Sequence, residues 1–483
     1  MGLLRKSKPD RINFFCRRNA LFVVAGMFGL VGTAVAAGDQ ARPRLVRVST
    51  DTTAQPGSQH ATQVEPDAVA VDTKIVATFQ VGRNFGGSAG AIGFAASTNS
   101  GATWTSGLLP SLTQQSSPPG AAAAASDPVV AWDAAHQRWL ITTLIANVAG
   151  ETRLAVSASA DGFSWLPPVT AIAYPRNPAL GTALDKQWHT CDNTATSPFF
   201  GRCYLAYTDL THGANPANPE EMIGVQSSSD GGLTWSSPVL LSVDADFVSP
   251  AVQPIVRPNG ELVIVFFEDG VVRAIRSNDG GATFAPRERI AALTFHTRPV
   301  TPDRLRGFSL PTATVDAAGA VYAAWPDCRF HTRCRTDDIV WTRSTRPRSW
   351  TRPRRVPLGP LRGLTQFTLP DLAVDPTSRG ARARLALTYY ALSNPNCTER
   401  TCLLDVHLVT SRTGGNRWTR PRRLNPRRMR LTWLAQTNSG RMVGDYTGTV
   451  FSGRRVVSVH VQARQPTAER FNEATYAYSL TLP

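Results

Sequence analysis

Three short segments of this chain bring together side chains that can do chemistry. Glu65-Pro66-Asp67 places two carboxylates around a proline, Asp185-Lys186-Gln187-Trp188 sets an acid, a cation and an indole in a row, and Asp445-Tyr446 lies between glycines. Carboxylates can donate and accept protons, a phenol can act as a nucleophile, and aromatic rings offer flat apolar surfaces. They act together only where the fold brings these segments to one place.

A recurring octapeptide, S-x-D-x-G-x-T-W, indicates which elements position these segments. Its copies are Ser97–Trp104, Ala158–Trp165, Ser228–Trp235, Ser277–Phe284, Ser344–Trp350 and Ser411–Trp418. The copy at 158–165 keeps only Gly162, Ser164 and Trp165. This pattern is the Asp-box, in which the carboxylate accepts backbone N–H groups within a tight turn. It predicts that Asp230 and Asp279 hold turns and are not catalytic.

Each Asp-box follows an apolar strand and precedes a strand opened by proline, and two further strands lie before it. We therefore expect repeated units of four antiparallel strands with the box in the turn between the third and fourth. Four-stranded units repeated radially form a β-propeller. The sequence predicts an all-β fold of seven blades, with residues 44–50 supplying the last strand of the seventh; six blades is the alternative.

A propeller built in this way has two distinct faces. The Asp-box turns share one face, so a site over the central channel would lie on the other, at the starts of first strands and the ends of second strands. On this geometry the candidate catalytic residues are Tyr446, Asp127 and Asp67. The candidate ligand-binding residues are Arg83, Asp185, Lys186, Trp188, Asp327, Arg329, Asp371 and Asp445.

The first 36 residues have the pattern of an export signal. A basic stretch precedes the apolar segment 20–35, which ends in Ala34-Val35-Ala36, an A-x-A cleavage site. Residues 37–64 then form an N-terminal segment and 65–483 the propeller. The six cysteines beyond the signal fall into the close pairs Cys191/Cys203, Cys328/Cys334 and Cys397/Cys402, which predict three disulfides in an oxidising compartment. We expect a secreted, cell-surface or periplasmic protein with no membrane span after cleavage.

The Asp-boxes, the opening Glu65-Pro66-Asp67, Leu184–Trp188 and Gly444–Gly448 together resemble the bacterial sialidase-like, exo-α-sialidase propeller family over about the whole chain after the signal. The resemblance implies a glycoside hydrolase that removes terminal sialic acids from glycans. In that family a tyrosine is the nucleophile, an aspartate the acid/base, and three arginines bind the sugar carboxylate. It would give these roles to Tyr446, to Asp127 or Asp67, and to Arg83 and Arg329 among the arginines.

Other interpretations stay open. The chain lacks the Arg-Ile-Pro type motif that sialidases carry near the first blade, which favours a non-catalytic propeller that binds glycan or protein at the cell surface. A propeller enzyme of another kind is a third alternative. No cofactor or metal motif is present in the sequence, so we expect neither.

The formal net charge is +16, and arginines gather at 346–362 and 417–430. Solvated outer edge strands explain these two runs best. Binding to an anionic cell-surface polymer is the alternative, and no nucleic-acid-binding motif accompanies them.

Overall fold

A computed structural model describes residues 44–147, 151–175, 183–211, 222–243, 251–296, 303–307 and 310–482. The chain divides into two units, 1–40 and 41–483. The predicted signal peptide lies outside the described residues. No described helix is long and apolar enough to cross a membrane.

Nearly all regular structure in the described residues is β-strand. Seven groups of four antiparallel partners can be traced. The first three are β2 (Ser58–Val71), β3 (Lys74–Asn84), β4 (Ala89–Ser97) and β5 (Thr105–Leu108); β6 (Ala122–Asp133), β7 (Arg138–Asn147), β8 (Glu151–Ser159) and β9 (Val169–Pro175); and β10 (Leu184–Cys191), β11 (Cys203–Asp209), β12 (Met222–Ser228) and β13 (Val239–Ser242).

The next three groups repeat the same order. They are β14 (Gln253–Val256), β15 (Leu262–Glu268), β16 (Val271–Ser277) and β17 (Glu288–Ala292); β18 (Thr312–Val315), β19 (Val321–Asp327), β20 (Asp338–Ser344) and β21 (Arg354–Arg355); and β22 (Gln366–Val374), β23 (Leu385–Leu392), β24 (Leu403–Ser411) and β25 (Arg422–Arg423).

The last group joins the two ends of the described chain. It holds β29 (Gly448–Ser452), β30 (Arg455–Ala463) and β31 (Glu473–Thr481), and its fourth strand is β1 (Arg44–Arg47), which pairs antiparallel with β31. The remaining elements are short: β26 (Met429–Arg430) on β24, the pair β27 (Ala435–Thr437) and β28 (Gly440–Met442), and the 3-10 turns Thr332–Cys334, Gly380–Arg382 and Leu431–Trp433.

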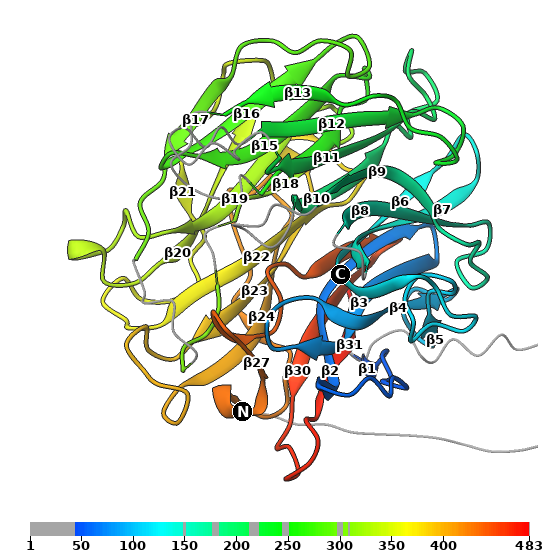
Figure 1. The fold of residues 1–483 in the computed structure, drawn as a ribbon. Coiled ribbons are helices and arrows are strands. Elements are labelled where there is room, and N and C mark those ends of the chain that lie inside the picture. The colour runs from blue at the N-terminus through cyan, green and yellow to red at the C-terminus, as the bar shows by residue number, and fades with distance from the viewer. Residues whose placement is uncertain are drawn as a thin grey trace, which may run out of the picture. The chain divides into compact units, whose positions relative to one another are not determined.

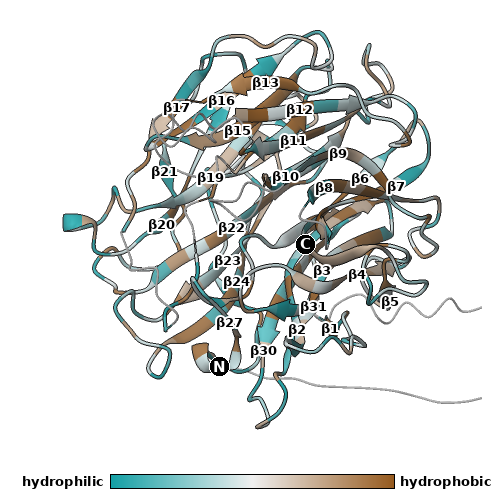
Figure 2. Ribbon diagram, viewed as in Figure 1, coloured by the Kyte–Doolittle hydropathy of each residue, from teal (hydrophilic) through white to brown (hydrophobic). Residues whose placement is uncertain are grey.

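The groups follow one another around a common centre (Figure 1). Their first strands touch in sequence, β2 to β6, β10, β14, β18, β22 and β29, and β29 touches β2 again. Apolar stretches run along the strands (Figure 2), and each hydrophobic cluster lies between neighbouring groups. One such cluster joins Val450 and Val457 to Ile75 and Phe79, across the point where the last group meets the first.

This arrangement confirms the predicted all-β propeller. The number of blades, seven or the alternative six, stays a prediction. The first, second and last groups are not separate sheets, because the single residue pairs Thr62–Glu473 and Ala89–Ala125 join them by hydrogen bonds. The three predicted disulfides, Cys191–Cys203, Cys328–Cys334 and Cys397–Cys402, are all present.

The turns between third and fourth strands show what the Asp-box does. Asp279 Oδ1 accepts the backbone N–H groups of Ala282 at 3.1 Å and Thr283 at 2.9 Å, and Ser277 Oγ donates to the same carboxylate oxygen at 2.8 Å. The copy placed at 158–165 in fact begins at Ser159, so it has one residue fewer than the S-x-D-x-G-x-T-W pattern. There Asp161 accepts from the N–H groups of Phe163 and Ser164, so this box does have its carboxylate.

Candidate functional site

The first strands of several groups share a distortion of the backbone. In β2, β6, β10 and β22 the pairing register shifts near the start of the strand, which marks a β-bulge. The bulges contain Glu65, Asp127, Lys186 and Leu369, whose φ angles are 54°, 49°, 49° and 51°. Non-glycine residues rarely occupy this left-handed region, and such strain gathers at functional sites.

Three of the four strained residues are charged, and they meet. Lys186 Nζ lies 3.8 Å from Glu65 Oε1, 3.8 Å from Asp127 Oδ2 and in direct contact with Asp445. Arg306 holds Asp445 from the other side in a bidentate pair, with Nε 3.0 Å from Oδ1 and Nη2 2.7 Å from Oδ2. We call these five residues the central cluster.

Burial and neighbouring charge set the protonation states of the cluster. Burial raises the pKa of Glu65 to about 8, and the charge of Asp127 adds to this effect. Burial opposes ionisation of Asp445 too, but Arg306 and Lys186 outweigh it and hold the pKa of that carboxyl well below its usual range. A neutral acid and a permanent carboxylate therefore lie within one group, as acid–base chemistry requires.

An aromatic pair stands beside the cluster. The rings of Trp188 and Tyr446 meet edge to face with centroids 5.2 Å apart, and Tyr446 Oη donates to the carbonyl of Pro128 at 3.1 Å. Burial raises the pKa of Tyr446, with the charge of Glu65 as the next contribution. The phenol is therefore neutral and needs a base to become a nucleophile.

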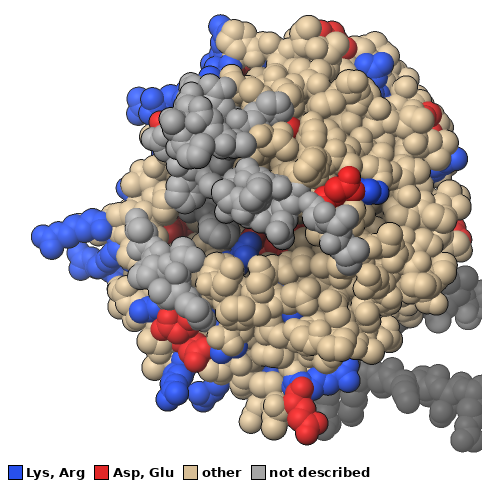
Figure 3. All heavy atoms as spheres, viewed as in Figure 1, with Lys and Arg blue, Asp and Glu red and all other residues tan. Residues whose placement is uncertain are grey.

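A cavity of about 40 Å³ opens here. Lys186, Trp188, Asp445 and Tyr446 line one side of it, and Leu310 and Leu369 line another. The strained positions on the first half of the ring are thus charged, whereas Leu369, at the matching place in β22, is apolar. Charged atoms are visible in a hollow near the middle of the face seen in Figure 3.

A second cavity of about 330 Å³ continues along the first strands. Asp67 and Asp371 both line it. Asp67 Oδ2 accepts from Val130 N at 2.8 Å, and Asp371 Oδ1 accepts from Thr312 Oγ1 at 3.3 Å. Burial raises the pKa of Asp67 to about 8 and that of Asp371 to about 7. Trp188 and Asp371 border both cavities, so the two form one path along the axis.

Most of the predicted site residues lie along this path. Asp127, Lys186 and Asp445 belong to the central cluster. Asp185 is half-buried next to it, and burial raises the pKa of that carboxyl to about 6 against the opposing charge of Lys186.

The remaining three predicted residues stand apart from the cavities. Arg83 is buried behind the cluster, where Nη1 donates to Gln80 Oε1 at 2.8 Å and to the carbonyl of Ser88 at 3.1 Å. Gln80 in turn contacts Glu65. Arg329 and Asp327 pair with each other, with Nε 2.8 Å from Oδ1, and no described hydrogen bond or ion pair links either of them to the central cluster.

Arg306 is the residue that the sequence did not point to. It lies in the segment 303–307, between groups, where no Asp-box, strand or repeated motif marks it. Glu65 was visible as a first-strand residue, but its place among the catalytic candidates follows only from its contacts.

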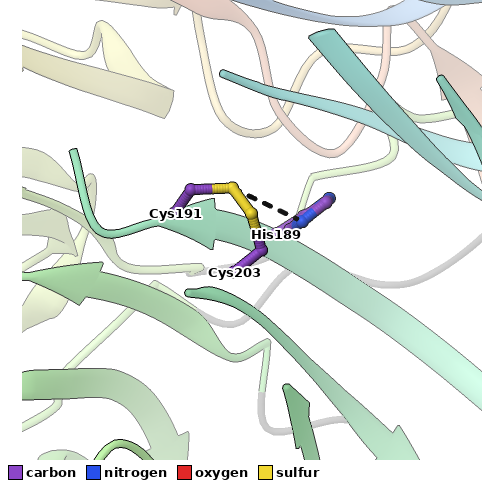
Figure 4. Close-up of side chains that lie close together, drawn as sticks. All are labelled: His189, Cys191 and Cys203. Carbon is purple, nitrogen blue, oxygen red and sulfur yellow. Dashed lines mark hydrogen bonds between the residues drawn. A yellow bond between two sulfur atoms is a disulfide. The ribbon is translucent and has the colours of Figure 1, made fainter. Parts of the chain in front are cut away.

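One group of residues in the described chain has metal-ligand types close together, namely His189, Cys191 and Cys203 (Figure 4). The two sulfurs form a disulfide in this structure, so they are not metal ligands in this state.

No protein-family model and no curated protein matches the chain. Solved structures that resemble it include the Hadza microbial sialidase Hz136, at 14% identity and TM-score 0.45, over 88% of this chain and 68% of that one. An alpha-L-arabinanase of Penicillium chrysogenum complexed with arabinobiose matches at 12% identity and TM-score 0.43, over 91% and 99%.

Trypanosoma rangeli sialidase in complex with the inhibitor DANA matches at 13% identity and TM-score 0.45, over 90% of this chain and 59% of that one. Identities and scores this low carry no argument about activity.

Proposed function

We propose that this chain is an exported propeller glycoside hydrolase that removes terminal sialic acids from glycans, with its site at the central cluster. The observation that supports this most is that Glu65, Asp127 and Arg306 gather around Lys186 and Asp445, which line one cavity together with Tyr446. A neutral acid, a carboxylate, two cations and an aromatic pair are the groups that cleavage of an acidic sugar requires.

Each residue has a role in this proposal. Tyr446 attacks the anomeric carbon, since an uncharged phenol is not repelled by the carboxylate of the sugar. Glu65, whose pKa burial raises to about 8, accepts the phenol proton in its ionised form. Asp127 protonates the leaving oxygen, with Asp67 as the alternative acid, while Lys186 and Arg306 bind the sugar carboxylate and Trp188 packs against the ring.

The test is hydrolysis of a fluorogenic α-sialoside by the mature chain and by Tyr446→Phe. We expect turnover by the wild type and a fall of at least about a hundredfold in kcat for the variant, because the nucleophile is lost. Tyr478→Phe is the matched control. Its hydroxyl accepts only a 3.3 Å contact from Arg422 on an outer strand, so activity should be unchanged.

A second candidate is a non-catalytic propeller that binds glycans. It is favoured by the small cavity, about 40 Å³, and by the engagement of both cations with Asp445. A folded wild-type chain with no turnover, together with glycan-array binding that Trp188→Ala abolishes, would select this candidate over the hydrolase.

A further inference from the structure

The Cys191–Cys203 disulfide lies close to the polar side chains of His189 and Asp133. Cys191 and Cys203 are directly opposite each other on β10 and β11. His189 precedes Cys191 by two residues, so its side chain leaves the same face of the strand (Figure 4). The Nε2 atom of His189 is 3.9 Å from Cys191 Sγ, and the ligand atoms of all three residues lie within 4.8 Å of one another.

The imidazole is held in the orientation of a metal ligand. His189 Nδ1 is 2.9 Å from Thr142 Oγ1, and Trp235 packs edge to face on the ring with centroids 5.4 Å apart. A proton on Nδ1 that is donated to Thr142 leaves the Nε2 lone pair directed at the sulfurs. A hydrogen bond on the far nitrogen is how proteins orient metal-binding histidines.

A carboxylate lies beside the group. Asp133 Oδ2 is 3.6 Å from Cys203 Sγ. Its other oxygen, Oδ1, accepts the N–H groups of Ala135 at 3.0 Å and His136 at 3.1 Å, and His136 Nδ1 approaches Oδ2 at 2.7 Å. The side chain is buried and fixed. The two sulfurs and the imidazole nitrogen of the group are three donors of the types that Zn²⁺ takes in proteins, which leaves its fourth tetrahedral position open.

The group can be reached from the axial path. His189 and Cys191 both line the cavity of about 330 Å³, together with Thr190 and Asn193. A small thiol and a metal ion therefore have a route to the disulfide without unfolding of the sheet.

We propose that reduction of the Cys191–Cys203 disulfide creates a site for one Zn²⁺ ion, bound by both thiolates and His189. Two equivalents of a small thiol reduce the disulfide and are oxidised to their own disulfide, which leaves two Cys thiols. Binding of Zn²⁺ then releases the two thiol protons to solvent. The group is thus a redox-gated metal site, and it does not depend on the hydrolase activity proposed above.

Cobalt(II) titration of the reduced full chain tests this proposal, because thiolate ligands give Co²⁺ an intense charge-transfer absorption. We expect one equivalent of Co²⁺ to bind and to produce this absorption band, and Zn²⁺ to displace the bound Co²⁺. The double variant Cys191→Ser/Cys203→Ser should show no such band. His189→Ala should weaken binding by about tenfold or more. His460→Ala, which removes another buried histidine with no cysteine grouped with it, should leave the affinity unchanged. Cys397→Ser/Cys402→Ser should also retain the band.

A second measurement needs no variant. The reduced wild type is reoxidised with and without Zn²⁺, and each disulfide is followed by peptide mass spectrometry. Zn²⁺ should slow re-formation of Cys191–Cys203 by about tenfold or more and leave Cys397–Cys402 unaffected. Equal rates for Cys191–Cys203 with and without Zn²⁺, or equal Co²⁺ binding by the wild type and by Cys191→Ser/Cys203→Ser, would overturn the proposal.

Discussion

Carboxylates at the Asp-box turns and carboxylates at the first strands differ in what surrounds them. In the turns, hydrogen bonds from Thr283 and its neighbours lower the pKa of Asp279 to about 2, and the N–H groups of Ser164 and Phe163 do the same for Asp161. Along the axis, burial raises the pKa of Glu65 and Asp67 to about 8. The conspicuous, repeated acids are thus held ionised in their turns, whereas Glu65 and Asp67, which belong to no repeated motif, keep a proton to higher pH.

Backbone conformation follows the same division. In the turns most left-handed positions are glycines such as Gly231 and Gly280, which take this conformation at little cost, with Ser100 and Arg348 as exceptions. At the axis the left-handed positions include Glu65, Asp127 and Lys186, which are not glycines and store strain. A chain tolerates such strain where surrounding contacts hold it, and here the ion pairs of the central cluster provide them.

The largest expected effect on stability comes from removing the charge of Asp445, the shared counterion of Lys186 and Arg306. Asp445→Asn leaves Lys186 and Arg306 buried without their shared carboxylate. We expect the free energy of unfolding to fall by about 3–5 kcal/mol, measured by chemical denaturation.

Asp230→Asn is the control on the other face. It weakens hydrogen bonds from Leu233 and Thr234 in an exposed turn and should lower the free energy of unfolding by about 1 kcal/mol. Equal losses for the two variants would contradict the division between the faces.

A further effect concerns pH. The pKa of Asp67 rises from 3.8 to about 8 on folding, so the folded state keeps a proton that the unfolded chain releases. Its stabilising contribution is complete below about pH 4 and is lost as pH rises to about 8, by at most about 1.4 kcal/mol per pH unit. Asp67→Asn cannot ionise, so its melting temperature should fall less over this range than that of the wild type. Parallel curves would show that Asp67 has no raised pKa.

The fold could be predicted largely from the sequence, because its signals are local. A Ser, an Asp, a Gly and an aromatic residue within eight positions specify a turn wherever they occur, as at Ser277–Phe284. The shortened box at Asp161 shows the limit of this approach, since one deletion shifts the alignment while the hydrogen bonds are kept.

The site was harder to predict because it is assembled from distant segments. Positions at the starts of first strands selected Asp127, Lys186 and Asp445, which lie together in the central cluster. The same reasoning selected Arg329, which instead pairs with Asp327 two residues away, and it passed over Arg306, whose partner Asp445 is 139 residues distant. Side-chain pairing of this kind depends on tertiary contacts that no local pattern records.

The most direct test of the account compares two aspartates, one from each face, in α-sialoside hydrolysis. Asp127→Asn should lower kcat/KM by about 10²–10⁴-fold, because it removes a general acid from the central cluster. Asp230→Asn should retain nearly full activity at a temperature where it is folded. Equal activities for the two variants would contradict the claim that the chemistry lies at the first strands.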